Sequence, residues 1–374
     1  MNGALNTSLI VALFTLVALR PPMPRRSTPF NLQFALGYLI NEQPFLGLWW
    51  LLAGTTATLI QPEVSSLLWW MVVGLSAVDA LALGMIALRA RSARPALSQA
   101  FRTAFGTGML PYWTRPRWFR IVLLPFISWR PDVRRIRNRR YGPAPRGNRL
   151  DVYVSRRHDR TDAPVLVYVH GGGFRMGSKM LGAHPLLYRL AAEGWVCISV
   201  DYHLFRASYR DQLADVRAAL AWTRDHAESF GGSPSTVFLA GGSSGAHLAA
   251  TAALTGAEVC GVIGLYGYYG ETGQPGSEPT SPHEYITADA PPFLIIHGAL
   301  DTLVLVEDAR TFAGHVQRVS RRPVAYAELP GTQHNFDFFH SVRFHSVTDA
   351  IVRFAELTRG SAESSSTGQP RGWF

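Results

Sequence analysis

The sequence predicts an α/β domain, with a mostly parallel sheet covered by helices on both faces, preceded by an apolar helical region. From residue 148 onward, short strand-like runs alternate with amphipathic helical segments. This alternation is typical of a parallel sheet whose strands are joined by crossover helices. About the first ninety residues are different, because they hold three apolar stretches and few charges.

The amino-acid composition indicates which classes of molecule the protein is expected to bind. The 374 residues are 47% hydrophobic and carry a formal net charge of +10. Arginines crowd residues 115–147, directly after the apolar region, and they are not interleaved with aromatic residues as in nucleic-acid-binding segments. Basic residues beside an apolar segment are typical of contact with anionic lipid headgroups. We therefore expect membrane lipids as partners and no nucleic acid.

Residues 1–94 are predicted to be a membrane-associated helical region. Its apolar stretches are residues 4–19, 32–60 and 66–88. The third is long enough to cross a bilayer, while the first is short and the second is interrupted by Pro44, so we expect two to three spans. Tryptophan pairs near segment ends (Trp49–Trp50, Trp69–Trp70) match interfacial aromatic belts. A buried helical hairpin within a soluble domain is the alternative.

The basic residues around these stretches predict an orientation. Arg20, Arg25 and Arg26 follow the first stretch, and Arg89, Arg91 and Arg94 follow the third. Because basic loops stay on the cytoplasmic side, a multi-pass membrane protein with its α/β domain in the cytoplasm is expected.

Two further segments flank the α/β domain. Residues 95–147, rich in Arg, Trp and Pro, are predicted to be a linker or lid. Within them, residues 118–129 form either an amphipathic helix lying in the membrane interface or a lid packed on the following domain. The catalytic domain is placed at residues 148–358, and the Ser/Gly-rich residues 359–374 are predicted to be a disordered tail.

The strongest local signal is Gly241-Gly242-Ser243-Ser244-Gly245. It follows the strand-like run TVFLA and opens an alanine-rich helix. A serine on a sharp turn between a strand and a helix exposes its hydroxyl for nucleophilic attack. Glycines at 241 and 245 are needed because larger side chains would clash with the adjoining strand and helix. Ser243 is the predicted nucleophile.

A second signal, His170-Gly171-Gly172-Gly173-Phe174, ends the strand-like run PVLVYVH. Acyl transfer develops negative charge on the former carbonyl oxygen, and backbone N–H groups must already point at it. Consecutive glycines allow this close approach, so the N–H groups of Gly171, Gly172 and Ser244 are the predicted oxyanion hole. A phosphate loop is disfavoured because neither GK[ST] nor GxGxxG is present.

The remaining signals are an acid and a base at strand ends. Asp301 follows the run PFLII, and His334 lies on the loop after VAYAEL. Such an acid accepts a hydrogen bond from the base and fixes its tautomer. Asp308 and Glu328 compete with Asp301, but they lie inside a predicted helix and strand. The order Ser, Asp, His then predicts Ser243, Asp301 and His334 as the catalytic residues, with no metal and no organic cofactor.

HGGGF, Val200-Asp201-Tyr202 and GGSSGAHLA together resemble the bacterial esterase and lipase family related to hormone-sensitive lipase, and its kynurenine-formamidase-like neighbours. The resemblance covers about residues 145–357. It implies an α/β-hydrolase fold and a carboxylesterase that acts on small-molecule or lipid esters through an acyl-enzyme intermediate. Gly242 and Ala246 depart from the usual GDSAGG, and with the short stretch after Leu265 they favour a small-cap esterase. An amidase or formamidase using the same site and a catalytically silent membrane scaffold are the alternatives.

Overall fold

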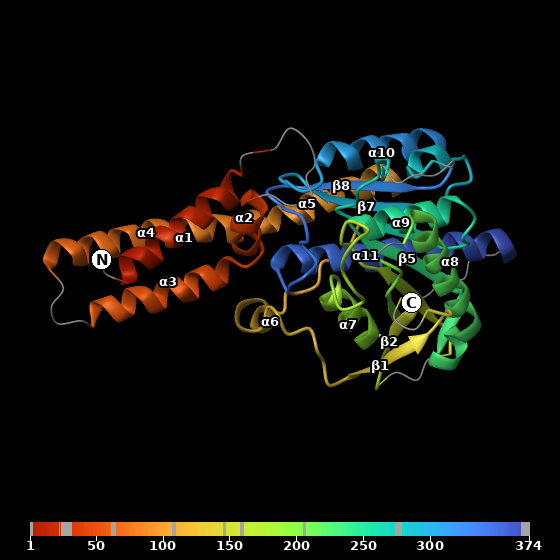
Figure 1. Ribbon diagram of the computed structural model, residues 1–374, viewed down its shortest axis with the longest axis horizontal. Helices are drawn as coiled ribbons and strands as arrows, with labels where there is room; N and C mark the ends of the chain where they lie inside the picture. Colours follow the sequence, from red (N-terminus) through yellow and green to blue (C-terminus); the bar gives the residue numbers. More distant parts are fainter. Residues whose placement is uncertain are drawn as a thin grey trace.

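The computed structural model describes residues 3–21, 23, 32–60, 65–106, 110–144, 147–157, 161–204, 207–273 and 279–367. In Figure 1 a globular body is built around a sheet, and an arm of long helices projects from one side of it. The arm consists of N-terminal residues and the body of the remainder.

The arm contains α1 (Gly3–Leu19), α2 (Leu32–Glu42), α3 (Pro44–Leu59) and α4 (Ser66–Arg89). The apolar stretch 32–60 becomes two helices because Pro44 lacks the N–H needed to continue α2 and is tolerated where α3 begins. The Ser65 hydroxyl caps α4 by accepting the Leu68 N–H at 3.4 Å. Through the short turn Ala90–Ser92, α4 continues into α5 (Ala93–Phe105), so one rod joins the arm to the body (Figure 1).

The body contains an eight-stranded sheet in the order β1-β2-β4-β3-β5-β6-β7-β8. Strands β3 to β8 are parallel, while β1 and β2 are antiparallel to their neighbours. This confirms the mostly parallel sheet. The strands are β1 (Val133–Arg140), β2 (Arg149–Ser155), β3 (Ala163–Val169), β4 (Val196–Val200), β5 (Gly232–Gly242), β6 (Gly261–Leu265), β7 (Phe293–Gly298) and β8 (Val324–Leu329).

Helices cover both faces of the sheet, as predicted. One apolar core joins the sheet to α8 (Tyr209–His226), α9 (Ser244–Leu254) and α10 (Val306–Val319). A second core, on the other face, joins it to α5, α7 (His184–Ala192) and α11 (Val342–Thr367). Because β3 to β8 are parallel, their carboxyl ends meet at one edge, where loops can present catalytic side chains.

The body begins earlier in the sequence than predicted. Residues 95–147 are not only a linker or lid, because Leu97 and Phe101 of α5 are buried in the second core and β1 pairs with β2. The sequence of β1, VRRIRNRR, hid this strand because its exposed side is covered with arginines. Charges of this kind are common on edge strands, where they discourage pairing with another chain.

Two smaller predictions also change. Within residues 118–129 only α6 (Trp118–Leu123) is helical. The tail predicted to be disordered begins as helix, because α11 continues to Thr367. An existing helix gains one hydrogen bond for each residue it adds, so extension needs no new nucleus. Residues 368–374 lie outside the described residues.

The two to three predicted membrane spans are not supported. Over the described ranges, the only helix both long and apolar enough to cross a membrane is the rod Ser66–Phe105, and a single such helix is weak evidence. The apolar part of α1 is shorter, and α3 has 16 residues because Pro44 divides the second stretch.

Candidate active site

Ser243 lies at a sharp turn between β5 and α9. Its backbone has φ 52° and ψ −122°, a region that non-glycine residues occupy only under strain. The surrounding structure holds it there, because its N–H donates to the carbonyl of Leu265 at 2.9 Å and its own carbonyl accepts the Ala246 N–H at 3.0 Å. Strained backbone of this kind is concentrated at functional sites.

The glycines on each side of the turn have the steric role that the sequence predicts. A Cβ on Gly241 would lie 2.3 Å from the Gly245 carbonyl oxygen, and a Cβ on Gly245 would lie 2.2 Å from the carbonyl oxygen of Val169. Both contacts are far inside van der Waals distance and involve backbone atoms. Only glycine therefore fits at either position.

Asp301 and His334 form a close, buried pair. His334 Nδ1 lies 2.6 Å from Asp301 Oδ2, and Asp301 Oδ1 accepts the N–H groups of Leu303 and Val304, each at 2.9 Å. Burial alone would raise the pKa of Asp301, but the charge and hydrogen bond of His334 and a further contact from His297 hold it well below its usual range. A carboxylate can only accept, so Nδ1 of His334 carries the proton and Nε2 is left as an acceptor.

His297 also contacts Asp301, and the sequence alone indicated no role for this histidine. This histidine lies next to the last residue of β7 and is fully buried, with Nε2 3.2 Å from Asp301 Oδ2 and 2.9 Å from the carbonyl of Val304. Burial lowers the pKa of His297, but the Asp301 carboxylate, the Val304 carbonyl and the charge of Asp308 together raise it above its usual value. The signal in the sequence was a histidine four residues before the candidate acid, at the same strand end.

Tyr266 lies between the turn that carries Ser243 and the ring of His334. The Tyr266 ring centroid lies 4.5 Å from that of His334, and a Cβ on Gly242 would lie 2.5 Å from the Tyr266 hydroxyl. No hydrogen bond joins Ser243 to His334 in the described part of the chain. Catalytic hydrogen bonds are often long in unliganded sites and tighten when substrate binds.

A buried carboxylate below the turn explains why Gly242 replaces the usual acid. Asp337 is fully buried and accepts hydrogen bonds from the hydroxyls of Tyr168 and Tyr266, at 2.8 and 2.5 Å, and from the Ala183 N–H at 2.9 Å. The two hydroxyls fill the space that a side chain at 242 would need. Burial raises the pKa of Asp337 despite these hydrogen bonds. Sequence reasoning missed this cluster, whose members come from β3, from the residue directly after β6 and from the loop after His334.

The glycine-rich loop after β3 lies directly against the nucleophile turn. A Cβ on Gly171 would lie 3.0 Å from Ser243 Cβ, and Gly172 has φ 134° with no room for a side chain, since its Cβ would lie 1.9 Å from the Met176 carbonyl oxygen. In the described structure the N–H groups of Gly171 and Gly172 make no hydrogen bond. Ser244 begins α9, so its N–H is one of the unpaired donors of a helix start.

His170, at the start of this loop, makes contacts that give it a structural role. Its buried ring stacks on Tyr202 with centroids 4.4 Å apart, and its carbonyl accepts the Tyr202 hydroxyl at 3.0 Å. It therefore holds the loop in place. Among the described residues, no three His, Cys, Asp or Glu side chains are grouped to hold a metal ion.

The arm reaches this site through α2. The Phe34 ring contacts the His334 ring edge-on, with centroids 6.4 Å apart, and Tyr38, one turn later, packs against Phe339 at 5.7 Å. These aromatic side chains place α2 beside the candidate base. Phe34 and His334 are far apart in the sequence, and no local pattern indicated their contact.

A mostly parallel sheet, a strained serine at a strand–helix turn, a buried Asp–His pair and a glycine loop define an α/β-hydrolase. The chain is 31% identical over 402 residues to the probable carboxylic ester hydrolase LipM of Mycobacterium tuberculosis, across 94% of this chain and 92% of the relative. The chain therefore belongs to the esterase and lipase family of α/β-hydrolases. It is a serine hydrolase that acts on carboxylic esters.

Other comparisons agree. Residues 150–269 match the BD-FAE family model. Esterase LipC of M. tuberculosis is 34% identical over 254 residues, which cover 57% of this chain and 63% of that protein. Esterase B of Lactobacillus rhamnosis superposes with a TM-score of 0.56 over 63% of this chain and 89% of its own, and at 17% identity this shows a shared fold alone.

Proposed function

We propose that the protein is a membrane-associated serine carboxylesterase in which Ser243 is the nucleophile, His334 the base and Asp301 the orienting acid. The observation that carries the proposal is the buried His334–Asp301 pair, 2.6 Å apart, beside the strained turn of Ser243. The N–H groups of Gly171, Gly172 and Ser244 form the oxyanion hole.

The proposed reaction has two halves. His334 Nε2 takes the proton of Ser243 as its Oγ attacks the ester carbonyl carbon, and the oxyanion hole stabilises the tetrahedral intermediate. The carbon–oxygen bond to the alcohol then breaks, and the alcohol leaves with the proton from His334. Water, deprotonated by the same histidine, releases the acid from the acyl-enzyme and restores Ser243.

Replacement of the nucleophile tests this assignment. Ser243→Ala is expected to lower kcat for p-nitrophenyl butyrate by at least about 10³-fold and to abolish labelling by a fluorophosphonate, because the attacking oxygen is lost. Ser235→Ala, a matched change on the exposed side of β5, is expected to keep both. Full turnover by a correctly folded Ser243→Ala protein would refute the assignment.

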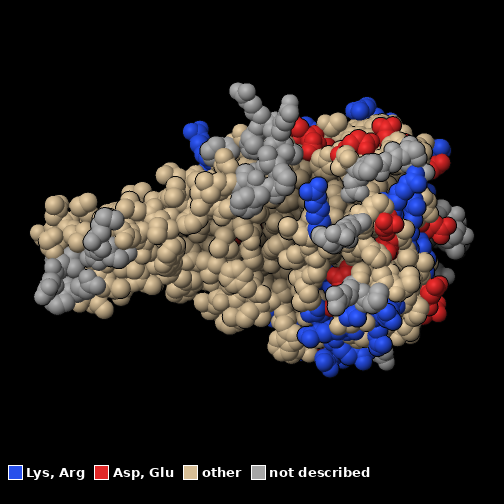
Figure 2. Space-filling view, in the orientation of Figure 1, with Lys and Arg blue, Asp and Glu red and all other residues tan. Residues whose placement is uncertain are grey.

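The surface of the arm supports membrane association. Its outward side chains are apolar, and in Figure 2 the arm shows almost no charge while Lys, Arg, Asp and Glu gather on the body. Several of its polar side chains point inward: Ser76 of α4 contacts the hydroxyls of Ser8 in α1 and Thr55 in α3, at 3.2 and 2.8 Å. An apolar exterior with small polar side chains bonded to one another between the helices is the arrangement of helices packed in lipid.

The proposal therefore places the arm in the bilayer. The 24 residues of α4 span about 36 Å, enough for a hydrocarbon core of about 30 Å. The basic residues that follow α1 and α4 favour a cytoplasmic body. Full-length protein is expected to stay with membranes during alkaline carbonate extraction. Release into the supernatant would show that the arm only packs against protein.

A further inference from the structure

A small cavity between α6, α7 and the start of α11 has a strongly basic lining. Its volume is about 30 Å³, room for roughly two water-sized groups. Four arginines and two histidines face it, and no carboxylate is among its lining residues in the described parts of the chain: Arg117, Arg120, Arg130, Arg189, His340 and His345.

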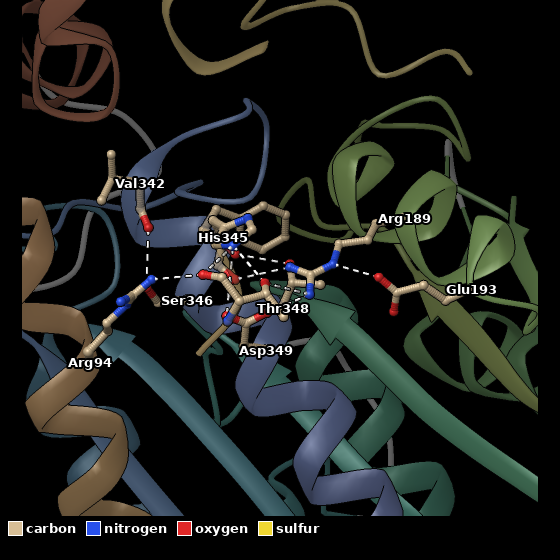
Figure 3. A network of polar contacts seen from close by, with 10 residues as sticks. Arg94, Arg189, Glu193, Val342, His345, Ser346, Thr348 and Asp349 are labelled. Atoms are coloured by element: carbon tan, nitrogen blue, oxygen red, sulfur yellow. Dashed lines mark hydrogen bonds and ion pairs between the residues drawn. The ribbon is translucent and has the colours of Figure 1, made fainter. Parts of the chain in front are cut away.

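Two of the four arginines have acidic partners. Arg130 pairs with Asp132 through two hydrogen bonds of 2.9 and 2.7 Å. Figure 3 shows Arg189 between Glu193 on one side and Asp349 on the other, with His345 beside it. The positive charge of these two guanidinium groups is therefore largely compensated.

The other two arginines keep their charge uncompensated. Arg120 donates only to the carbonyls of Ile127 and Trp129, at 2.8 and 3.3 Å. The exposed side chain of Arg117 makes no hydrogen bond or ion pair with any described residue. Guanidinium groups without a carboxylate partner favour an oxyanion, which they can hold with paired N–H donors.

His340 provides an independent sign of a missing ligand. Its buried Nε2 atom has no hydrogen-bond partner in the described part of the structure. Burial, followed by the nearby charges of Arg120 and Arg130, lowers the pKa of His340 to about 4. A buried ring nitrogen left without a partner is costly. In the neutral tautomer that carries its proton on Nε2, His340 can donate this hydrogen bond to an oxyanion in the cavity.

The position of the cavity indicates the source of the oxyanion. Trp118 and Phe119 of α6 are exposed beside it. This short helix is held to the arm, because Trp49 Nε1 of α3 donates to the Val122 carbonyl at 3.2 Å and Phe45 packs edge-on against Trp118. The cavity thus lies where the arm meets the body, which is headgroup level if the arm is inserted in a bilayer.

We propose that this cavity binds the phosphate group of an anionic phospholipid headgroup, with Arg117 and Arg120 as its principal donors. The choice of a lipid rests on the membrane arm of the proposed function, whereas the choice of a phosphate rests on the cavity alone. With Trp118 and Phe119 entering the interface beside the phosphate, the site fixes the orientation of the catalytic body against the membrane.

Thermal unfolding of the full chain in a nonionic detergent tests the site. At constant ionic strength, dihexanoyl phosphatidic acid is expected to raise Tm by roughly 2–5 °C, because a ligand that binds the folded state stabilises it. Arg120→Gln and Arg117→Gln should each remove most of this rise. Arg117→Gln matters most because its side chain makes no described contact, so folding is preserved. Arg139→Gln, an exposed arginine on β1, is the matched control and should keep the rise.

The possible outcomes separate the alternatives. An equal rise with inorganic phosphate alone would support the oxyanion site and refute the lipid source. No rise with either probe, or an equal loss in Arg139→Gln, would overturn the proposal, because only general charge attraction would remain. If carbonate washes the chain from membranes while the rise persists, the membrane arm is refuted and the oxyanion site stands.

Discussion

The arm and the body of this protein expose opposite kinds of side chain to their surroundings. The body places valines, leucines and aromatic residues inside two cores and most of its charges outside. The arm has a small apolar core of its own, but it also buries Ser8, Ser76 and Asp79, and it exposes leucines and tryptophans. Each region is arranged for a different solvent, because a side chain is placed where transfer to its surroundings is favourable. The junction between them must therefore satisfy polar groups that face neither water nor lipid.

That junction is a buried polar cluster. Arg343 at the start of α11 pairs with Glu42 at the end of α2, and it also donates to the carbonyl of Gly331 at 3.3 Å, on the loop that carries His334. Arg89 at the end of α4 donates to the Asn41 side chain at 2.8 Å. Gln43 donates to the His340 carbonyl at 2.7 Å. The arm is thus attached to the loop of the proposed base.

The largest expected effect lies in the body. Asp301→Asn should lower kcat by at least about 10³-fold with little change in fold, because the amide no longer fixes the tautomer of His334. Steady-state turnover of p-nitrophenyl butyrate measures it. Asp308→Asn, at the competing acid on α10, is the control. If Asp308→Asn lost more activity than Asp301→Asn, the acid would have to be reassigned.

The next largest effect is expected from breaking the Glu42–Arg343 ion pair at the junction. Glu42→Ala leaves the buried Arg343 without its carboxylate and is expected to destabilise the protein by about 3–5 kcal/mol. Thermal unfolding in detergent measures this loss. Glu307→Ala breaks the exposed pair with Arg310 and should change stability by less than about 1 kcal/mol. Equal effects of the two variants would mean that arm and body are not joined here.

Lysine substitutions at two positions along α4 can test whether the arm lies in lipid or in water. Leu81 lies near the middle of α4 and is 71% exposed, while Leu88 is exposed near its end. In lipid, Leu81→Lys should cost about 3 kcal/mol, whereas a lysine at position 88 can extend its amine to the interface. The fraction retained after carbonate extraction should therefore fall more for Leu81→Lys. Identical behaviour would indicate that the arm faces water.

The smallest expected effect concerns the contact of the arm with the site. Phe34→Ala removes the ring that contacts His334 and should lower kcat/KM for p-nitrophenyl octanoate by roughly tenfold, because apolar surface beside the substrate is lost. Leu32→Ala, an exposed position on the same helix, is the control. A kcat/KM that is unchanged in Phe34→Ala would place the substrate away from α2.

The sequence by itself determined the order of helices and strands from residue 148 onward and the local chemistry of the site. GGSSG and HGGG occupy consecutive residues, and their glycines are required by contacts within a few residues or with the adjoining strand. Asp301 and His334 were predictable because the carboxyl ends of parallel strands share one edge of a sheet. Their close approach is seen in the structure, and their catalytic roles remain proposals.

Only the tertiary structure decided the rest. The Asp337 cluster, the support of Asp301 by His297 and the contact of Phe34 with His334 depend on how distant segments pack. The same is true of the Glu42–Arg343 pair. Periodicity and motifs indicate which side chains of a segment are buried. They do not indicate which other segment those side chains pack against. That choice is made by the packing of the whole chain, since a buried polar group is stable only where another segment supplies its partner.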